Sequence, residues 1–192
     1  MNRDTFALLT PVLLLGLLLS LAGCGGPSVF LDRSFDFNYV ERVAVIPFDN
    51  LSPSQTAGRQ ATLMFITELL ATETFNVIEP GETARILAEV NPRSPGSLDR
   101  DQIRTLGQKL NAQALVFGTV SESSNLRNGG STVPTVTMDL RMVETESGET
   151  IWAATHTEGR PGVLTSLFGV SGKSTSETMR SCVNEMLSTL IQ

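Results

Sequence analysis

The thiol of Cys24 is the first side chain of the sequence with a distinctive chemistry, and it stands at the end of an apolar segment. A run of mostly Leu, Ala and Val extends from Ala7 to Leu21. A membrane-spanning helix needs roughly 20 apolar residues, whereas the central region of a secretory signal peptide has about 7 to 15. A cysteine at this position could end a transmembrane segment, form half of a disulfide or carry a covalent group. The length of the run favours a signal peptide.

The residues around Cys24 point to the third alternative. Leu21, Ala22 and Gly23 precede the cysteine, and a flexible Gly-Gly-Pro-Ser stretch follows it. This arrangement resembles the lipobox of bacterial lipoproteins, in which the cysteine becomes the first mature residue. Its thiol then receives a diacylglycerol and its amine usually a further acyl chain, and two or three chains hold a protein stably on a membrane. The resemblance predicts a signal peptide over residues 1–23 and a lipid on Cys24, while a signal peptide that happens to contain a cysteine is the alternative.

The residue after the lipobox bears on which membrane holds the anchor. In enteric bacteria an Asp at this place favours retention in the inner membrane, and here the residue is Gly25. The resemblance therefore implies a lipoprotein on the periplasmic face of the outer membrane. Apart from the lipid on Cys24, we expect no cofactor.

Phosphate-binding chemistry is suggested by the stretch GVSGKST at residues 169–175. A phosphate-binding loop needs a Gly five positions before Gly172, and Leu167 stands there. The alternative is a purely structural role, as a loop that leads into a capped helix. We expect no bound nucleotide. The formal net charge of −6 and the lack of a basic run also exclude a typical nucleic-acid-binding protein.

No set of residues points to catalysis. The single histidine, His156, is expected on an exposed strand end, with no Gly-x-Ser-x-Gly motif elsewhere. Asp99 and Asp101 are typical of charges at a helix N-terminus, and Glu144 and Glu146 of a solvated strand end. Two further residues are expected in or near the core, namely Cys182, which lacks a disulfide partner if Cys24 carries lipid, and Trp152. The sequence predicts a protein that is not an enzyme and has no metal site.

The pattern of apolar residues predicts an α/β domain over residues 42–192. Residues 42–48 are apolar on both faces, which indicates a buried strand, and strict alternation over residues 135–143 indicates a strand with one buried face. Capping patterns begin helices at Ser52, Asp99 and Ser174. The predicted strands cover residues 42–48, 75–80, 112–123, 135–143 and 150–157, and the predicted helices cover residues 52–72, 80–90, 99–110 and 174–190. This order, β-α-β-α-α-β-β-β-α, predicts a mixed β-sheet flanked by helices.

Two segments carry apolar side chains that we expect at an interface. Residues 24–41 are interpreted as a lipidated tether, in which the two-residue period of FDFNY suggests an edge strand or a segment that packs on a neighbour. Residues 160–173 form a Gly-rich loop whose apolar side chains either contact a partner or fold into the core. The candidate interface residues are Phe35, Phe37 and Tyr39 in the tether, and Val163, Leu164, Leu167 and Phe168 in the loop.

Four segments together resemble one family of bacterial lipoproteins. They are RVAVIPFDNLS at residues 42–52, FNVIEPGETARILAEV at 75–90, LNAQALVFGTV at 110–120 and LRMVETESGETIWAAT at 140–155. They are similar to the CsgG/HfaB group, whose members secrete curli subunits or anchor a holdfast. The LpoB activators of penicillin-binding proteins and the N-terminal domain of TolB resemble the same α/β unit.

The resemblance implies a function by protein contact. We expect an outer-membrane lipoprotein that assists assembly or secretion of an envelope or extracellular structure, with other envelope proteins and further copies of itself as partners. The alternative is an LpoB-like regulator of a peptidoglycan synthase. The two differ in a measurable way, because the first favours a homo-oligomeric ring and the second a domain that stimulates a partner in trans.

Overall fold

The chain folds around one mixed β-sheet. The computed structural model describes residues 26–128, 131–159 and 173–191. Seven strands lie in the order β1-β7-β6-β5-β2-β4, and β3 pairs with the far part of β5. Strands β5, β6 and β7 form an antiparallel meander, while β2 runs parallel to both β5 and β4. The strands are β1 (Ser28–Leu31), β2 (Arg42–Val45), β3 (Asp49–Asn50), β4 (Asn76–Val77), β5 (Ala114–Asn128), β6 (Ser131–Glu144) and β7 (Thr150–Glu158).

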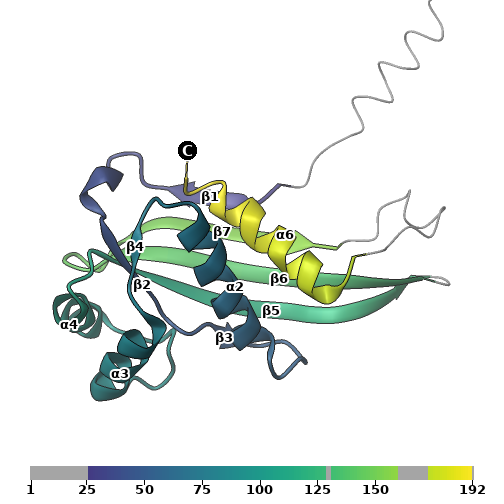
Figure 1. Ribbon diagram of the computed structural model, residues 1–192, viewed down its shortest axis with the longest axis horizontal. Coiled ribbons are helices and arrows are strands. Elements are labelled where there is room, and N and C mark those ends of the chain that lie inside the picture. Colours follow the sequence, from purple (N-terminus) through teal and green to yellow (C-terminus); the bar gives the residue numbers. More distant parts are fainter. Residues whose placement is uncertain (1–25, 129–130, 160–172, 192) are drawn as a thin grey trace, which may run out of the picture.

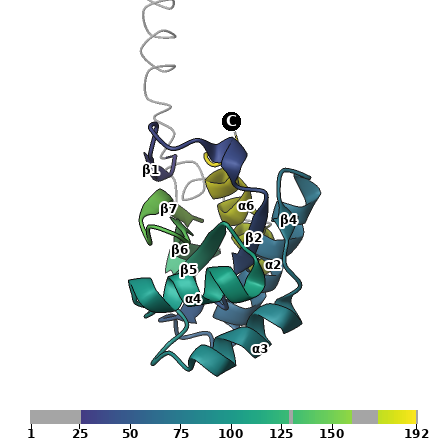
Figure 2. The same ribbon diagram turned by 90° about the vertical axis from the view of Figure 1, so that its left-hand side faces the viewer.

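In the described part of the chain four α-helices flank this sheet, so the predicted mixed sheet flanked by helices is confirmed. Helices α2 and α6 cover one face, and α3 and α4 cover one end of the other (Figures 1 and 2). The opposite face of the meander, beyond α3 and α4, has no helix over it in the described part of the chain. The helices are α2 (Ala57–Ala71), α3 (Pro80–Val90), α4 (Arg100–Leu110) and α6 (Thr175–Leu187).

The two helical layers explain why one segment of the sheet is buried on both faces and another on only one face. Val43 and Val45 of β2 pack towards α2 and α6, whereas Ala44 and Ile46 pack towards α3 and α4, so this segment is buried on both sides. In β6 the apolar residues of the alternating pattern, such as Met138, face α6 and are buried. The hydrophobic periods of the sequence therefore predict which sheet faces are covered.

Of the four predicted helix starts, α3 at Pro80 and two of the three capping boxes are confirmed. Asp99 and Ser174 both form capping boxes, with Gln102 and Glu177 respectively. The box predicted at Ser52 is wrong, because α2 begins only at Ala57. The Asn50 side chain accepts hydrogen bonds from the Ser52 backbone at 3.1 Å and from its hydroxyl at 2.7 Å. These bonds hold the segment in a turn that competes with helix initiation.

The first described segment differs most from the prediction. Strand β1 pairs antiparallel with β7, with Leu31 opposite Trp152, so part of the predicted tether 24–41 belongs to the domain. Of the two alternatives for FDFNY, the edge strand is wrong, because residues 37–39 form a single turn of 3₁₀ helix, η1 (Phe37–Tyr39). The Asp36 carboxylate accepts a hydrogen bond from the backbone N–H of Asn38, and this local cap favours the turn over a strand.

The meander also extends further than predicted. Strand β5 continues past Ser123 to Asn128, and β6 begins at Ser131. A register shift between Val120 and Glu122 allows the long hairpin to bend. The long strands carry the hairpin away from α3 and α4, as Figure 1 shows.

Candidate functional site

The outer edge of the sheet at β1 exposes apolar side chains. Val29 is 44% exposed and Phe30 is 53% exposed, and β1 has only one neighbouring strand in the described part of the chain. Arg33 follows β1 and is also exposed. We call these three residues, Val29, Phe30 and Arg33, the β1 rim. Apolar side chains at a sheet edge are a typical feature of a contact surface.

A groove runs beside the β1 rim. Its volume is about 740 Å³, and its floor includes Phe35, Phe37 and Thr189. The rings of Phe35 and Phe37 meet edge to face at 5.2 Å and 82°. Both rings are half-buried and pack against the core of the domain. These two predicted interface aromatics therefore support η1 from within the same chain.

The charges next to the rim are arranged asymmetrically. The carboxylate of Asp32 accepts hydrogen bonds from the Ser34 hydroxyl at 2.6 Å and the Ser34 backbone N–H at 2.9 Å. These bonds lower the pKa of Asp32. Arg33 forms no ion pair with any described residue. Its guanidinium is consequently available for an external anion.

Tyr39, the third predicted interface aromatic, lies at another corner of the domain. Its ring is 48% exposed, and its hydroxyl donates a hydrogen bond to Glu146 Oε1 at 3.2 Å. The negative charge of Glu146 raises the pKa of Tyr39. A hollow of about 460 Å³ adjoins this pair, and Arg104 lines it while donating two hydrogen bonds to the Glu146 carbonyl. The hollow is polar and its principal charged groups are already paired within the chain.

A second hollow, of about 330 Å³, lies on the uncovered face of the meander. The Asp139 carboxylate there accepts hydrogen bonds from Ser121 at 2.5 Å and Thr155 at 2.7 Å. The Arg141 guanidinium stacks 4.5 Å above the Phe117 ring, and burial lowers its pKa. These partners fix both charged side chains along the strands, and the arrangement presents no base beside a nucleophile.

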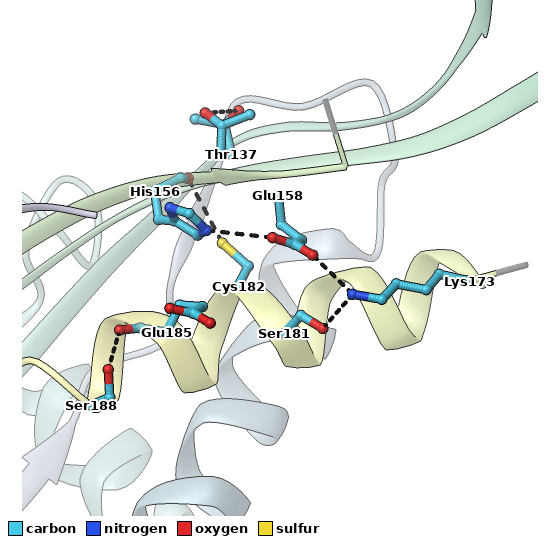
Figure 3. A network of polar contacts seen from close by, with 9 residues as sticks. Thr137, His156, Glu158, Lys173, Ser181, Cys182, Glu185 and Ser188 are labelled. Carbon is cyan, nitrogen blue, oxygen red and sulfur yellow. Dashed lines mark hydrogen bonds and ion pairs between the residues drawn. The ribbon is translucent and has the colours of Figure 1, made fainter. Parts of the chain in front are cut away.

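His156 is buried, so its predicted exposure is wrong. Only 7% of the residue is exposed, because α6 lies over this part of β7 (Figure 3). Its Nε2 lies 3.5 Å from Glu158 Oε2 but has no hydrogen-bond partner. Glu158 also pairs with Lys173 at 3.0 Å. Side chains alternate between the two faces of a strand, and His156 lies four residues after Trp152 on the same face of β7. This alternation is the sequence signal that indicates the burial of His156.

The thiol of Cys182, next to His156, has low reactivity. Cys182 is buried, as predicted, and its Sγ donates to the His156 carbonyl oxygen at 3.7 Å. Burial raises the pKa of this thiol to about 12, with the nearby Glu158 carboxylate acting in the same direction. The thiolate is therefore scarce at neutral pH, and the cluster in Figure 3 holds α6 on the sheet.

Glu144 is also placed differently from the prediction of a solvated strand end. The residue is buried, and its carboxylate accepts hydrogen bonds from the backbone N–H groups of Glu146 and Ser147, both at 2.7 Å. The Ser147 hydroxyl donates a third bond at 2.6 Å. Glu144 thus closes the β6–β7 turn, whereas Asp99 and Asp101 lie at a helix N-terminus as predicted.

Several predicted site residues fall outside the residues that the structure describes. They are the lipobox residues Leu21, Ala22, Gly23 and Cys24, and the loop residues Val163, Leu164, Leu167 and Phe168. Within residues 26–128, 131–159 and 173–191, no group of three His, Cys, Asp or Glu side chains could hold a metal ion. None of the helices in these ranges is both long and apolar enough to cross a membrane.

The fold and its surfaces define the class of protein first. It is an α/β domain with a mixed sheet, polar hollows whose charges are paired internally, and one apolar sheet edge near the N-terminal end. The chain belongs to the family of CsgG, the curli production assembly/transport component, whose family model matches residues 42–192. The predicted resemblance to the CsgG group is confirmed. No curated protein matches the chain by sequence comparison.

Solved structures with the same fold include two proteins, PelC and lipoprotein GNA1162. A PelC dodecamer from Paraburkholderia phytofirmans is 18% identical with a TM-score of 0.57, over 85% of this chain and 97% of that chain. A substituted PelC dodecamer from the same organism is 19% identical with a TM-score of 0.60, over 86% and 98%. Lipoprotein GNA1162 from Neisseria meningitidis is 17% identical with a TM-score of 0.56, over 78% and 99%. At these identities the likeness concerns the fold.

Proposed function

We propose that this chain is an outer-membrane lipoprotein that acts by protein contact in the assembly or secretion of an envelope or extracellular structure. The observation that carries the proposal is the family match over residues 42–192, to a family named for curli assembly and transport. In this proposal the lipid on Cys24 holds the domain at the periplasmic face of the membrane, and the domain itself performs no catalysis.

We further propose that the working form is a homo-oligomer. The two PelC structures, which share the fold, are dodecamers. Apolar side chains that a domain does not bury are available for contacts between copies. In this proposal the loop side chains Leu167 and Phe168 contribute to that interface.

Light scattering of the detergent-solubilised, lipidated chain tests this function. We expect a protein mass of several copies, and mass spectrometry of the same sample should find the acyl chains on Cys24. The variant with Leu167→Ser and Phe168→Ser should fall to the mass of one copy without a change in its urea unfolding midpoint. Leu51→Ser is the matched control, because Leu51 is an apolar residue that is 75% exposed.

A monomer of wild-type chain would contradict the oligomer. In that case the LpoB-like alternative, an activator of a peptidoglycan synthase, would become the better proposal. If the double Ser variant keeps the wild-type mass, the loop is not the interface even though the oligomer exists.

A further inference from the structure

The β1 rim lies very near the proposed lipid anchor. Only Gly25, Gly26 and Pro27 separate Cys24 from Ser28, where β1 begins. A fully extended chain gains at most about 3.6 Å per residue, so Ser28 lies within about 14 Å of Cys24. The start of β1 is thus kept within about 14 Å of the residue that would carry the acyl chains.

The apolar side chains of the rim project from both faces of the sheet edge. Phe30 pairs with Ala153, next to Arg141 on the uncovered face of the meander. Val29 pairs with Ala154, which belongs to the core beneath α6. Whichever face of the edge strand tilts towards the membrane, an apolar side chain is directed to it.

These side chains stand out among the exposed apolar residues. The described part of the chain has seven large hydrophobic residues with substantial exposure, and Val29 and Phe30 are the two nearest to Cys24 in sequence. The remaining five are spread over other elements, at Tyr39, Leu51, Leu63, Leu70 and Leu126. An apolar pair next to a lipid anchor is what a second membrane contact requires.

The charged residues of the segment 28–39 are two carboxylates, Asp32 and Asp36, and one cation, Arg33. Ser34 satisfies the carboxylate of Asp32 through two hydrogen bonds, whereas Arg33 is exposed and has no ion-pair partner among the described residues. A guanidinium binds phosphate oxygens with two parallel hydrogen bonds. The rim therefore combines apolar side chains with a guanidinium that has no ion-pair partner among the described residues, while the Asp32 and Asp36 carboxylates accept local hydrogen bonds from Ser34 and Asn38.

We propose that the β1 rim lies in the headgroup layer of the bilayer that holds the lipid on Cys24, with Phe30 and Val29 against the acyl chains and Arg33 on lipid phosphates. This inference rests on the proposed lipidation. The outer edge of β1 has backbone groups that pair with no described strand, and such groups do not enter the hydrocarbon region. The β1 rim consequently reaches only the interface between the headgroups and the acyl chains.

The contact fixes the orientation of the domain. In Figure 2, β1 lies at one side of the molecule and α3 and α4 at the other. With β1 on the membrane, α3 and α4 point into the periplasm. A lipid anchor alone would leave the domain free to rotate about a flexible linker.

Fluorescence quenching by lipids tests the inference on the full-length chain. The variant Phe30→Trp is reconstituted in phosphatidylethanolamine and phosphatidylglycerol vesicles, with and without bromine on the acyl chains. The native Trp152 is fully buried and provides a constant background. We expect the introduced indole to shift its emission to the blue on reconstitution and to lose intensity in brominated vesicles. Leu51→Trp is the matched control and should show neither change.

The outcomes separate this inference from the proposed function. Variant chains that float with the vesicles while the indole from Phe30→Trp is not quenched would overturn the membrane contact and leave the anchor standing. A blue shift without quenching would likewise overturn it, because the rim would then be covered by protein. A chain that does not float and carries no acyl chain on Cys24 would overturn the anchor and the contact together.

Discussion

At the scale of single residues, the buried groups Cys182, His156 and Glu144 lie where α6 or the β6–β7 turn meets the sheet. Cys182 lies on an apolar helical stripe and is buried as predicted, since the stripe itself defines the core face. His156 and Glu144 are polar residues near strand ends, where exposure is the usual outcome. Both are buried because of distant or irregular features, namely the packing of α6 on β7 and the path of the β6–β7 turn. The alternation along β7 indicates the buried face for His156, whereas no local pattern encodes the path of the turn that buries Glu144.

Glu144 gives a prediction at this scale. Burial acts to raise the pKa of its carboxyl, but the hydrogen bonds from Ser147 and from backbone N–H groups outweigh it and lower the pKa below the ordinary 4.5. Glu144→Gln cannot accept all three bonds, so it should reduce the free energy of unfolding at pH 7 by about 1–3 kcal/mol. Urea unfolding followed by circular dichroism measures this loss, and the exposed neighbour in the same turn provides the control variant Glu149→Gln.

The pH dependence of this difference follows from the sign of the shift. A carboxyl with a lowered pKa stabilises the fold above its unfolded-state pKa, and this contribution is lost as the pH falls through the folded-state pKa. The difference between wild type and Glu144→Gln should therefore shrink as the pH falls below the ordinary 4.5. A difference that stays constant from pH 7 to acid would show that the loss comes from packing instead of charge.

At the scale of elements, the sequence predicts those whose signal is local. Helices α3 and α4 follow the predicted limits closely, because Pro80 and the Asp99 capping box mark their starts. Strand β1 was missed as a strand. Its four residues are too few to show an alternating hydrophobic pattern, and its partner β7 lies more than 100 residues further along the chain. Pairing of that kind is decided by tertiary contact.

Gly107 tests how tightly α4 packs on the end of the sheet. It lies inside the helix, where replacing glycine by alanine ordinarily stabilises by about 1 kcal/mol. Here an added Cβ would overlap the side chain of Thr145, whose hydroxyl is held by the Ala112 carbonyl at 2.8 Å. Overpacking costs about 1–3 kcal/mol, so Gly107→Ala should lower the thermal midpoint.

A second glycine in a helix provides the comparison for this prediction. At Gly81 in α3 the added Cβ would meet only the exposed carboxylate end of Glu79, whose displacement costs at most the N-cap bonds from Gly81 and Glu82, about 1 kcal/mol. Differential scanning calorimetry of Gly107→Ala and Gly81→Ala should find the larger loss at Gly107. A rise in the midpoint for Gly107→Ala would mean that α4 shifts freely on the sheet.

At the scale of the whole molecule, the described domain begins earlier than the family match. The match starts at residue 42, but β1 completes the sheet and Leu31, Phe35 and Phe37 pack against the core. In the proposed lipoprotein, Cys24 is thereby linked to a structural strand through a few residues. A short link keeps the sheet close to the membrane, whereas a long flexible tether would not.

Two truncated chains test where the folded unit begins. One starts at Pro27 and the other at Arg42, and neither contains Cys24. Removal of residues 27–41 exposes the edge of β7 and the side chains under η1. Each half-buried apolar side chain contributes about 1 kcal/mol, so the shorter chain should lose about 3 kcal/mol or more in urea unfolding.

Its exposed β7 edge should also promote aggregation, which sedimentation velocity would detect. Equal unfolding midpoints for the two chains would show instead that residues 27–41 act as a tether, because a strand that contributes to the sheet cannot be removed without cost.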